Sequence, residues 1–299
     1  MKQKNIFLEG LDSFTLHILA ISFMILDHLW NVFFVNQNQI WMNLLGRLAF
    51  PIFAFMLVEG FYKTKNRSKY LKRIFIFAVI SEIPFNLLVS TSVFGSPSIF
   101  FPYNNVLWTF GIALYMLVLF EKIKNKDNLP VTVKIFGKII ISILAMFITR
   151  LIVSDYREYG IMMVLVFYFF RSKKWWNFIA QVILLAWINI FLIWGYNVTL
   201  NCFGNEINVS SQSFAIFSLV FIWLYNGKQG IHNKITKYMF YSFYPLHLLL
   251  IVMIYIFLRN TSFIELNDIS IVTKNGFNYK FIEIPNSKIG RKIGIEIFN

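Results

Sequence analysis

Ionisable side chains lie inside long apolar stretches of this sequence, and the first such stretch carries His17, Asp27 and His28. Because an ionisable group inside a membrane span costs a few kcal/mol on insertion scales, each one is a candidate for function. An α-helix turns about 100° per residue, so His17 and His28 would share a face about 16 Å apart along the axis. Asp27 would point about 100° away from His28, toward a partner on another helix. For His17, a plain interfacial position is the alternative.

Arg47 lies inside the second apolar stretch. A buried guanidinium stays charged, so it needs a carboxylate or backbone carbonyls as partners. Asp27, Glu59 and Glu82 are the candidate partners. A purely structural ion pair is the alternative to a functional role for Arg47.

Further polar groups lie where helices are expected to break or end. Pro84 would free a helical carbonyl between Glu82 and Asn86. Tyr244 and His247 are three residues apart and would share a helix face. The candidate substrate contacts are Glu59, Glu82, Asn86, Asn104, Asn105, Asp155, Tyr244 and His247. Helix capping by the asparagines, a solvated loop at Asp155 and an interfacial kink at Pro245 are the alternative interpretations.

The elements that must position these residues are membrane helices. Of the 299 residues, 58% are hydrophobic and 14% charged, whereas a soluble domain usually has about 25% charged residues. This composition excludes a soluble enzyme, a disordered regulator and a nucleic-acid-binding protein. About nine stretches (eight to ten) are long enough, or nearly so, to cross about 30 Å of hydrocarbon. They lie near 14–35, 41–62, 70–90, 104–121, 133–153, 159–171, 175–194, 211–226 and 236–258, and the sixth and eighth are short.

Positive charge alternates between the expected loops. Lysine and arginine gather in loops 63–73, 121–138, 171–174 and 226–237, whereas loops 36–40, 91–103 and 195–210 carry none. This is the pattern of the positive-inside rule, so we expect a multi-pass membrane protein with a cytoplasmic N-terminus. The net charge of +14 is then a topology signal and an attraction to anionic lipid, rather than a mark of nucleic-acid binding.

Residues 1–260 are expected to form one all-α transmembrane domain, and 261–299 a polar C-terminal tail of unknown role. An odd number of spans would place the tail outside and an even number inside. The first span is not expected to be a cleaved signal peptide, because it contains ionisable residues and no small-residue cleavage site follows. The single cysteine, Cys202, excludes a disulfide framework, and the scattered histidines predict no metal site.

Short motifs are spread over residues 11–250. They are Leu26-Asp27-His28, Gly46-Arg47-Leu48-Ala49-Phe50-Pro51-Ile52-Phe53-Ala54-Phe55, Glu59-Gly60, Glu82-Ile83-Pro84-Phe85-Asn86, Asn104-Asn105, Tyr159-Gly160 and Tyr244-Pro245-Leu246-His247-Leu248-Leu249-Leu250. With these motifs the chain resembles the TraX family, bacterial membrane proteins associated with N-terminal acetylation of pilin. The tail from residue 261 has no counterpart in this resemblance.

TraX-like proteins are in turn distantly similar to the acyltransferase-3 membrane family, in which a basic residue, ten further residues and then a histidine lie on the first span. His17 and His28 have that spacing here, with His17 in place of the usual Arg or Lys. The resemblance implies transfer of an acetyl or other small acyl group from acetyl-CoA. The acceptor would be an exported peptide, a pilin N-terminus or a cell-surface glycan.

The resemblance also implies roles for individual residues. His28 would act as general base or carry the acyl group, with Asp27 or another carboxylate fixing its tautomer. Arg47 and the amides of Asn104 and Asn105 would stabilise the oxyanion. The residues expected to bind coenzyme A at the inner face are His17, Lys69 and Arg73.

Two other functions remain open from the sequence. A transporter or flippase would use Asp27, His28, Arg47 and Glu82 as a proton or substrate relay, although no inverted repeat supports it. A non-catalytic assembly subunit is the third possibility. CoA-dependent labelling of an acceptor separates acyl transfer from both.

Overall fold

The computed structural model describes residues 10–35, 39–193, 195–202, 205–260, 269–274, 277–282 and 293–297. In this part of the chain, seven helices are long and apolar enough to cross a membrane. They are α2 with η1 (Ser13–Leu29, Trp30–Phe34), α3 with α4 (Ile40–Gly46, Ala49–Lys63), α5 (Arg67–Phe94), α6 (Val106–Lys124), α7 (Val131–Leu151), α9 with η2 (Trp175–Ala186, Trp187–Leu192) and α11 (Lys234–Asn260).

The expected count of about nine spans is therefore wrong for the described residues. The sixth and eighth apolar stretches form α8 (Arg157–Phe169) and the pair η3 (Ser211–Phe217) and α10 (Ser218–Trp223). Thirteen residues of α-helix, the length of α8, cover only about 20 Å, less than the hydrocarbon thickness. Both short elements thus begin inside the bundle, which leaves irregular backbone at depth.

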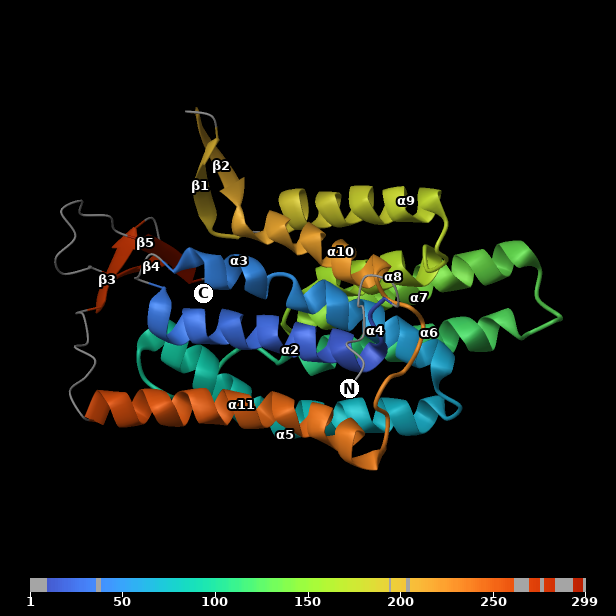
Figure 1. Ribbon diagram of the computed structural model, residues 1–299, viewed down its shortest axis with the longest axis horizontal. Helices are drawn as coiled ribbons and strands as arrows, with labels where there is room; N and C mark the ends of the chain where they lie inside the picture. Colours follow the sequence, from blue (N-terminus) through green and yellow to red (C-terminus); the bar gives the residue numbers. More distant parts are fainter. Residues whose placement is uncertain are drawn as a thin grey trace, which may run out of the picture.

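The basic loops meet at one end of the bundle, as the charge pattern predicts (Figure 1). The connections 64–66, 125–130, 170–174 and 224–233 all lie at this end, which we call the basic end. The segment 95–105 and the hairpin described below lie toward the opposite end. The last residues of α11 reach the opposite end too, which agrees with the side that an odd number of spans gives for the tail.

The segment 95–105 runs back into the bundle alongside α5. Gly95, with φ 65°, ends α5 in the left-handed conformation that glycine adopts without strain. The amide N–H of Ser98 then donates to Ser90 at 2.7 Å, and further on Asn105 Nδ2 donates to the carbonyl of Ala78 at 2.8 Å. Ala78 lies about 24 Å from the end of α5 along its axis. Non-helical backbone at such depth is tolerated only where protein buries it or where it lines a cavity.

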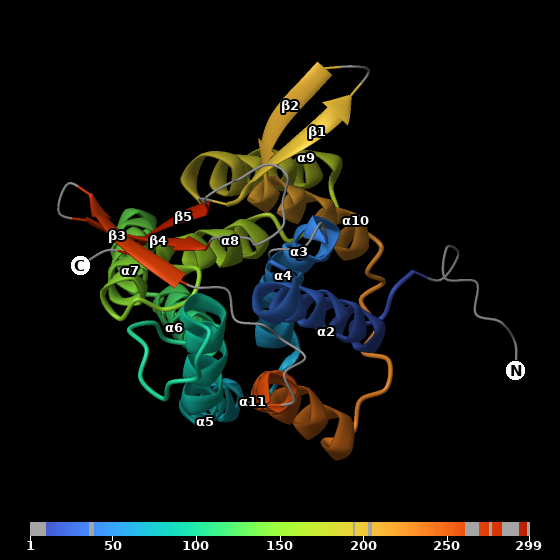
Figure 2. The ribbon, with the colours of Figure 1, turned by 90° about the vertical axis from the view of Figure 1, so that its left-hand side faces the viewer.

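The centre of the bundle is the helix pair α3 and α4, visible between its neighbours in the end-on view (Figure 2). In the most apolar 18-residue segment of this span, 72% is buried inside the protein, whereas 6% of the corresponding segment of α7 is buried. The faces of α7 that carry Ile139, Ile143 and Phe147 are exposed, as lipid-facing surface must be. The candidate residue of α4, Glu59, therefore sits in protein rather than in lipid.

Two small antiparallel sheets modify the all-α expectation. β1 (Asn197–Cys202) and β2 (Asn205–Ser210) pair as a hairpin that projects from the bundle, with Asn197 opposite Ser210. Within the predicted tail, β3 (Ile269–Lys274), β4 (Phe277–Ile282) and β5 (Ile293–Ile297) pair in sequence order. The other tail residues lie outside the described part of the chain.

Candidate functional site

His28 and His247 are hydrogen-bonded to each other inside the bundle. Nδ1 of His28 lies 2.8 Å from Nε2 of His247, and Nδ1 of His247 lies 2.8 Å from the carbonyl oxygen of Phe243. A carbonyl only accepts, so His247 donates from Nδ1 and, when neutral, accepts at Nε2. His28 must then donate from Nδ1, which leaves the lone pair of its Nε2 free among the described contacts. His28 stays partly exposed, whereas His247 is buried.

Asp27 pairs with Arg47 and not with His28. It is one of the three carboxylates that the sequence suggests as partners for Arg47. One oxygen of Asp27 accepts from the guanidinium of Arg47 and, at 3.0 Å, from the amide of Asn43. The helix breaks between α3 and α4 at Arg47, which turns the side chain inward. At Gly46 an added Cβ would lie 2.4 Å from Cβ of Asp27, so the close approach of α2 and α3 requires glycine.

A chain of buried amides continues from Arg47. Gln212 at the start of η3 accepts from Arg47 at 3.5 Å and donates to Asn189 at 2.9 Å. Gln212 and Asn189 are 2% and 0% exposed. The early start of the short helix η3 is what brings Gln212 to the level of Arg47.

The turn before α8 carries Asp155 to the same region. Val153, Tyr156 and Arg157 have φ values of 51°, 59° and 39°, a left-handed conformation that costs non-glycine residues energy. The turn is fixed by the amide of Asp155, which donates to the carbonyl of Asn104 at 2.8 Å. Burial raises the pKa of Asp155 to about 6, against the opposing effect of the Arg47 charge. The structure thus places a weakly acidic carboxyl beside the guanidinium, rather than in a solvated loop.

Glu82 lies in a separate network on α5. It accepts hydrogen bonds from Asn105 Nδ2 at 2.6 Å and from the indole of Trp108 at 2.9 Å. Asn105 also caps α6 by accepting from the amide of Leu107 at 3.1 Å. Asn86 Nδ2 donates to the carbonyl of Ile99 at 3.1 Å and so holds the segment that runs back beside α5.

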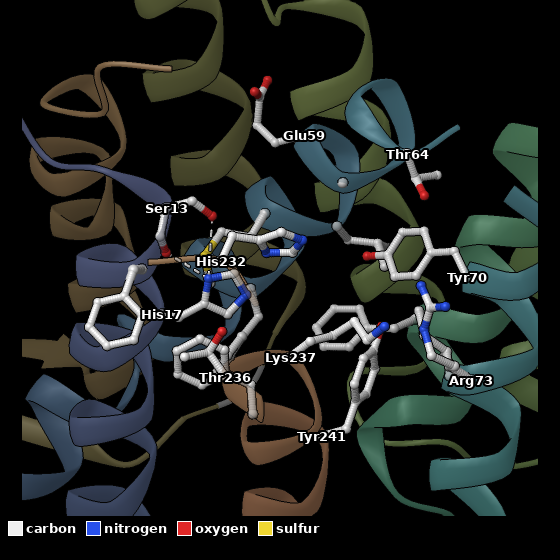
Figure 3. A pocket seen from close by; sticks show the side chains of 18 of the residues that line it. Ser13, His17, Glu59, Thr64, Tyr70, Arg73, His232, Thr236, Lys237 and Tyr241 are labelled. Atoms are coloured by element: carbon white, nitrogen blue, oxygen red, sulfur yellow. Dashed lines mark hydrogen bonds between the residues drawn. The ribbon is translucent and has the colours of Figure 1, made fainter. Parts of the chain in front are cut away.

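A cavity of about 520 Å³ opens at the basic end and runs between α2, α4, α5, α6 and α11 (Figure 3). Its mouth is basic and aromatic: His17 and His232 lie on one side, and Tyr70, Arg73 and Tyr241 on the other. The guanidinium of Arg73 lies 5.9 Å from the ring centroids of both tyrosines, and its Nε is buried without a hydrogen-bond partner in the described structure.

The deep end of the cavity is lined by Met24, Phe243 and Tyr244. Met24 lies one turn before His28 on α2, and the other two lie one turn before His247 on α11. The cavity therefore ends about 5 Å short of the histidine pair.

The family model described as TraX protein matches residues 13–255. The chain belongs to the TraX family. A relative from Dichelobacter nodosus is 28% identical over 255 residues, which is 83% of this chain and 97% of the relative. That relative is named as a probable fimbrial assembly protein, FimC of serogroup H1. No solved structure matches the chain.

The site expected from the TraX resemblance is divided in space. The cavity holds His17, Arg73, Glu59 and Tyr244, whereas Lys69 is exposed outside it. Glu59 bonds Arg171 at 2.6 Å near the mouth, far from Arg47 along the α4 axis. Asn104 donates its side-chain amide to the carbonyl of Ile152.

Sequence reasoning missed several buried polar groups of this TraX family member. Asn43, Asn189 and Gln212 lie in apolar stretches, and their polarity alone was the available signal. The partnership of His28 with His247 had no local signal, because the two residues are 219 positions apart. In the described residues no group of three or more His, Cys, Asp and Glu side chains is arranged to hold a metal ion.

Proposed function

We propose that this chain is an acyltransferase of the bacterial cytoplasmic membrane, with its N-terminus and basic end in the cytoplasm. It would take an acetyl or other small acyl group from acyl-CoA at the basic end. It would pass that group to an acceptor that reaches His28 from the opposite end.

The observation that carries this proposal is the alignment of the cavity with the histidine pair. His17, Ile21 and Met24 line the cavity from mouth to deep end, and His28 follows one turn later on the same face of α2. A thioester whose nucleotide stays at the mouth would therefore present its acyl group toward His28. A cavity that is basic at the entrance and apolar at its end suits an extended donor with phosphates at one end.

The hydrogen bonds of the pair support a general-base role for His28. The acceptor nucleophile forms a bond to the thioester carbonyl carbon, and Nε2 of His28 takes the proton that the nucleophile loses. When the carbon–sulfur bond breaks, the thiolate of coenzyme A takes that proton from His28. His247 holds the tautomer throughout, which is the role expected for a carboxylate from sequence.

The mouth offers cations and aromatic rings to the donor. Arg73 has an unsatisfied N–H, and Lys63, Lys65 and Lys237 also line the entrance. Arginine and lysine bind phosphate groups, and tyrosine rings can stack on a base. Lys69 is one turn away on α5 and would act only by long-range attraction.

The acceptor is proposed from the family rather than from the site. The relative's name refers to fimbrial assembly, and the TraX resemblance implies a pilin N-terminus. An exported peptide or a cell-surface glycan are the other acceptors to test.

A relay for transport receives less support. Asp27 with Arg47, His28 with His247, and Glu82 with Asn105 form three networks. Among the described residues no hydrogen bond joins one network to another, as a continuous proton relay would need.

The test is acyl transfer by purified protein in lipid nanodiscs. Radiolabelled acetyl-CoA is supplied with a pilin N-terminal peptide, an unrelated exported peptide or a surface glycan. We expect label in one acceptor with wild-type protein and none with His28→Ala. Ser22→Ala is the control, because Ser22 lies exposed on the same helix. Transfer by His28→Ala at the wild-type rate would remove His28 from the mechanism, and no transfer by wild type to any acceptor would reject the proposal.

A further inference from the structure

The oxyanion of the proposed reaction needs hydrogen-bond donors, and the side chains expected to supply them are engaged elsewhere. Asn104 donates to the carbonyl of Ile152, and Asn105 to Ala78 and Glu82. The terminal nitrogens of Arg47 bond Asp27 and Gln212. The N–H groups in these bonds would have to leave their partners before they could meet a thioester carbonyl. Nε of Arg47 is buried without a partner in the described structure, but Arg47, Asn104 and Asn105 do not line the cavity.

We infer that the hydroxyl of Tyr244, backed by the N-terminus of α6, is the oxyanion donor of the acyl-transfer reaction. This inference rests on the proposed function and adds a catalytic residue to it. Tyr244 lines the deep end of the cavity and is only 7% exposed. Its ring centroid lies 5.7 Å from that of His247, the partner of His28. An acyl group at the deep end would therefore lie between the phenol and the general base.

The phenol of Tyr244 lies near the first turn of α6, within electrostatic reach of the backbone N–H of Val106. As the first residue of the helix, Val106 has no carbonyl partner within α6, and its N–H carries part of the positive end of the helix dipole. The positive end of α6 thus lies near the phenol, whose O–H takes part in none of the described hydrogen bonds and is free to donate.

The described contacts give that O–H no acceptor. Asp155 and Glu82 lie within electrostatic reach of Tyr244, but no hydrogen bond to either is seen. Glu82 already accepts from Asn105 and Trp108, and Asp155 accepts from the amide of Tyr156 at 3.0 Å. An O–H that lines a cavity without an acceptor is placed to meet a carbonyl oxygen of a ligand there.

The chemistry follows from this arrangement. As the nucleophile adds to the thioester, charge develops on the carbonyl oxygen, and the O–H of Tyr244 donates to it. The positive end of the α6 dipole, near Val106, further stabilises the negative charge that develops there. The phenol keeps its proton, and when the carbon–sulfur bond breaks the carbonyl forms again. Removing one oxyanion donor typically lowers kcat about 100- to 1,000-fold.

Tyr244→Phe tests the inference because it removes the hydroxyl and keeps the ring. In nanodiscs with acetyl-CoA, we expect kcat to fall about 100-fold or more, while the KM for acetyl-CoA changes little. Tyr255→Phe is the matched control. It lies on the same helix, is 5% exposed and also loses a hydrogen bond, from its hydroxyl to the carbonyl of Gly95 at 2.8 Å. We expect its kcat to equal that of wild type.

A second measurement keeps the test independent of folding. Melting temperatures of both variants show whether each protein is intact, and binding of the ethyl thioether of coenzyme A, which lacks the carbonyl, shows whether the donor cavity is intact. Tyr244→Phe should bind this thioether as wild type does. Turnover by Tyr244→Phe within threefold of wild type would overturn the role of Tyr244 and leave the acyltransferase proposal standing. If Tyr244→Phe lost turnover and thioether binding in parallel, that result too would overturn the role of Tyr244 as oxyanion donor and leave the acyltransferase proposal standing. Inactive wild-type protein would reject both.

Discussion

Nδ1 of His28 lies 2.8 Å from Nε2 of His247, although 219 positions separate the two residues in the chain. The carbonyl of Phe243 accepts from the other nitrogen of His247 and so sets the direction of both hydrogen bonds. A neutral His28 is thereby held in the tautomer whose Nε2 can take a proton. In the proposed mechanism, this buried histidine takes the place that a carboxylate has in many general-base pairs.

Replacing the orienting histidine should slow the chemistry without weakening donor binding. In His247→Ala, Nδ1 of His28 loses its acceptor and the ring can turn, so we expect kcat to fall about 100-fold. His247→Gln restores an acceptor oxygen and should recover part of that loss. The measurements are kcat and the KM for acetyl-CoA in nanodiscs, with Ser22→Ala as the control. If His247→Ala turns over as wild type does, the pair only packs the helices together.

The membrane class and the basic end were predictable from sequence, because hydropathy and loop charge are summed over many residues. Depth was not. Hydropathy identifies α8 as an apolar stretch, but only the tertiary structure shows that this helix of thirteen residues begins inside the bundle. That depth is what places Asp155 beside Arg47. Of the three carboxylates proposed for Arg47, Asp27 is selected by the close approach of α2 and α3 at Gly46, a contact that no local pattern encodes.

Arg47 should be needed for stability as well as for turnover. Arg47→Ala leaves Asp27 with a half-buried charge, whose one remaining side-chain hydrogen bond in the described structure comes from Asn43. Breaking a buried pair typically costs about 3–5 kcal/mol. Arg47→Lys keeps the charge but cannot reach both Asp27 and Gln212, so it should restore folding better than kcat. Thermal unfolding in detergent and acetyl transfer are the two readouts. A Lys variant with wild-type turnover would show that Arg47 acts only as a charge.

Asp155 should make stability depend on pH. Its pKa rises from 3.8 to about 6 in the folded protein, chiefly through burial. The native state then holds the proton more tightly than the unfolded state, so stability should fall as pH rises from about 4 through about 6 and then stay constant. Asp155→Asn cannot ionise, and at pH 8 it should be more stable than wild type by at most about 3 kcal/mol.

Melting temperatures at pH 4, 6 and 8 test this dependence. Asp127→Asn is the matched control, because Asp127 lies exposed in the connection between α6 and α7. Its melting curve should follow that of wild type at every pH. An unchanged pH dependence in Asp155→Asn would mean that the carboxyl is solvated in the protein.

Cysteine labelling offers a test of orientation. Thr199 lies exposed on β1, in the hairpin that projects near the opposite end of the bundle. If the basic end faces the cytoplasm, a membrane-impermeant maleimide should label Thr199→Cys, made in a Cys202→Ser background, in cells whose outer membrane has been opened. In a Cys202→Ser background, Lys124→Cys at the basic end should react only after the inner membrane is permeabilised. The reverse pattern of labelling would invert the proposed topology.

His17 gives a test of donor binding that is separate from chemistry. Its ring lines the mouth of the cavity, and its Nδ1 donates to the carbonyl of Ser13 at 2.7 Å, so only Nε2 remains for a ligand. The acyltransferase-3 resemblance implies a fixed cation at this position, and an unperturbed histidine is cationic only below about pH 6.5. His17→Arg or His17→Lys should therefore keep or raise activity at pH 8. His17→Ala should raise the KM for acyl-CoA more than it lowers kcat, because in the proposed mechanism the residue would touch the donor far from the reacting carbon. If His17→Ala binds and uses acyl-CoA normally, the spacing between His17 and His28 has no role in donor binding.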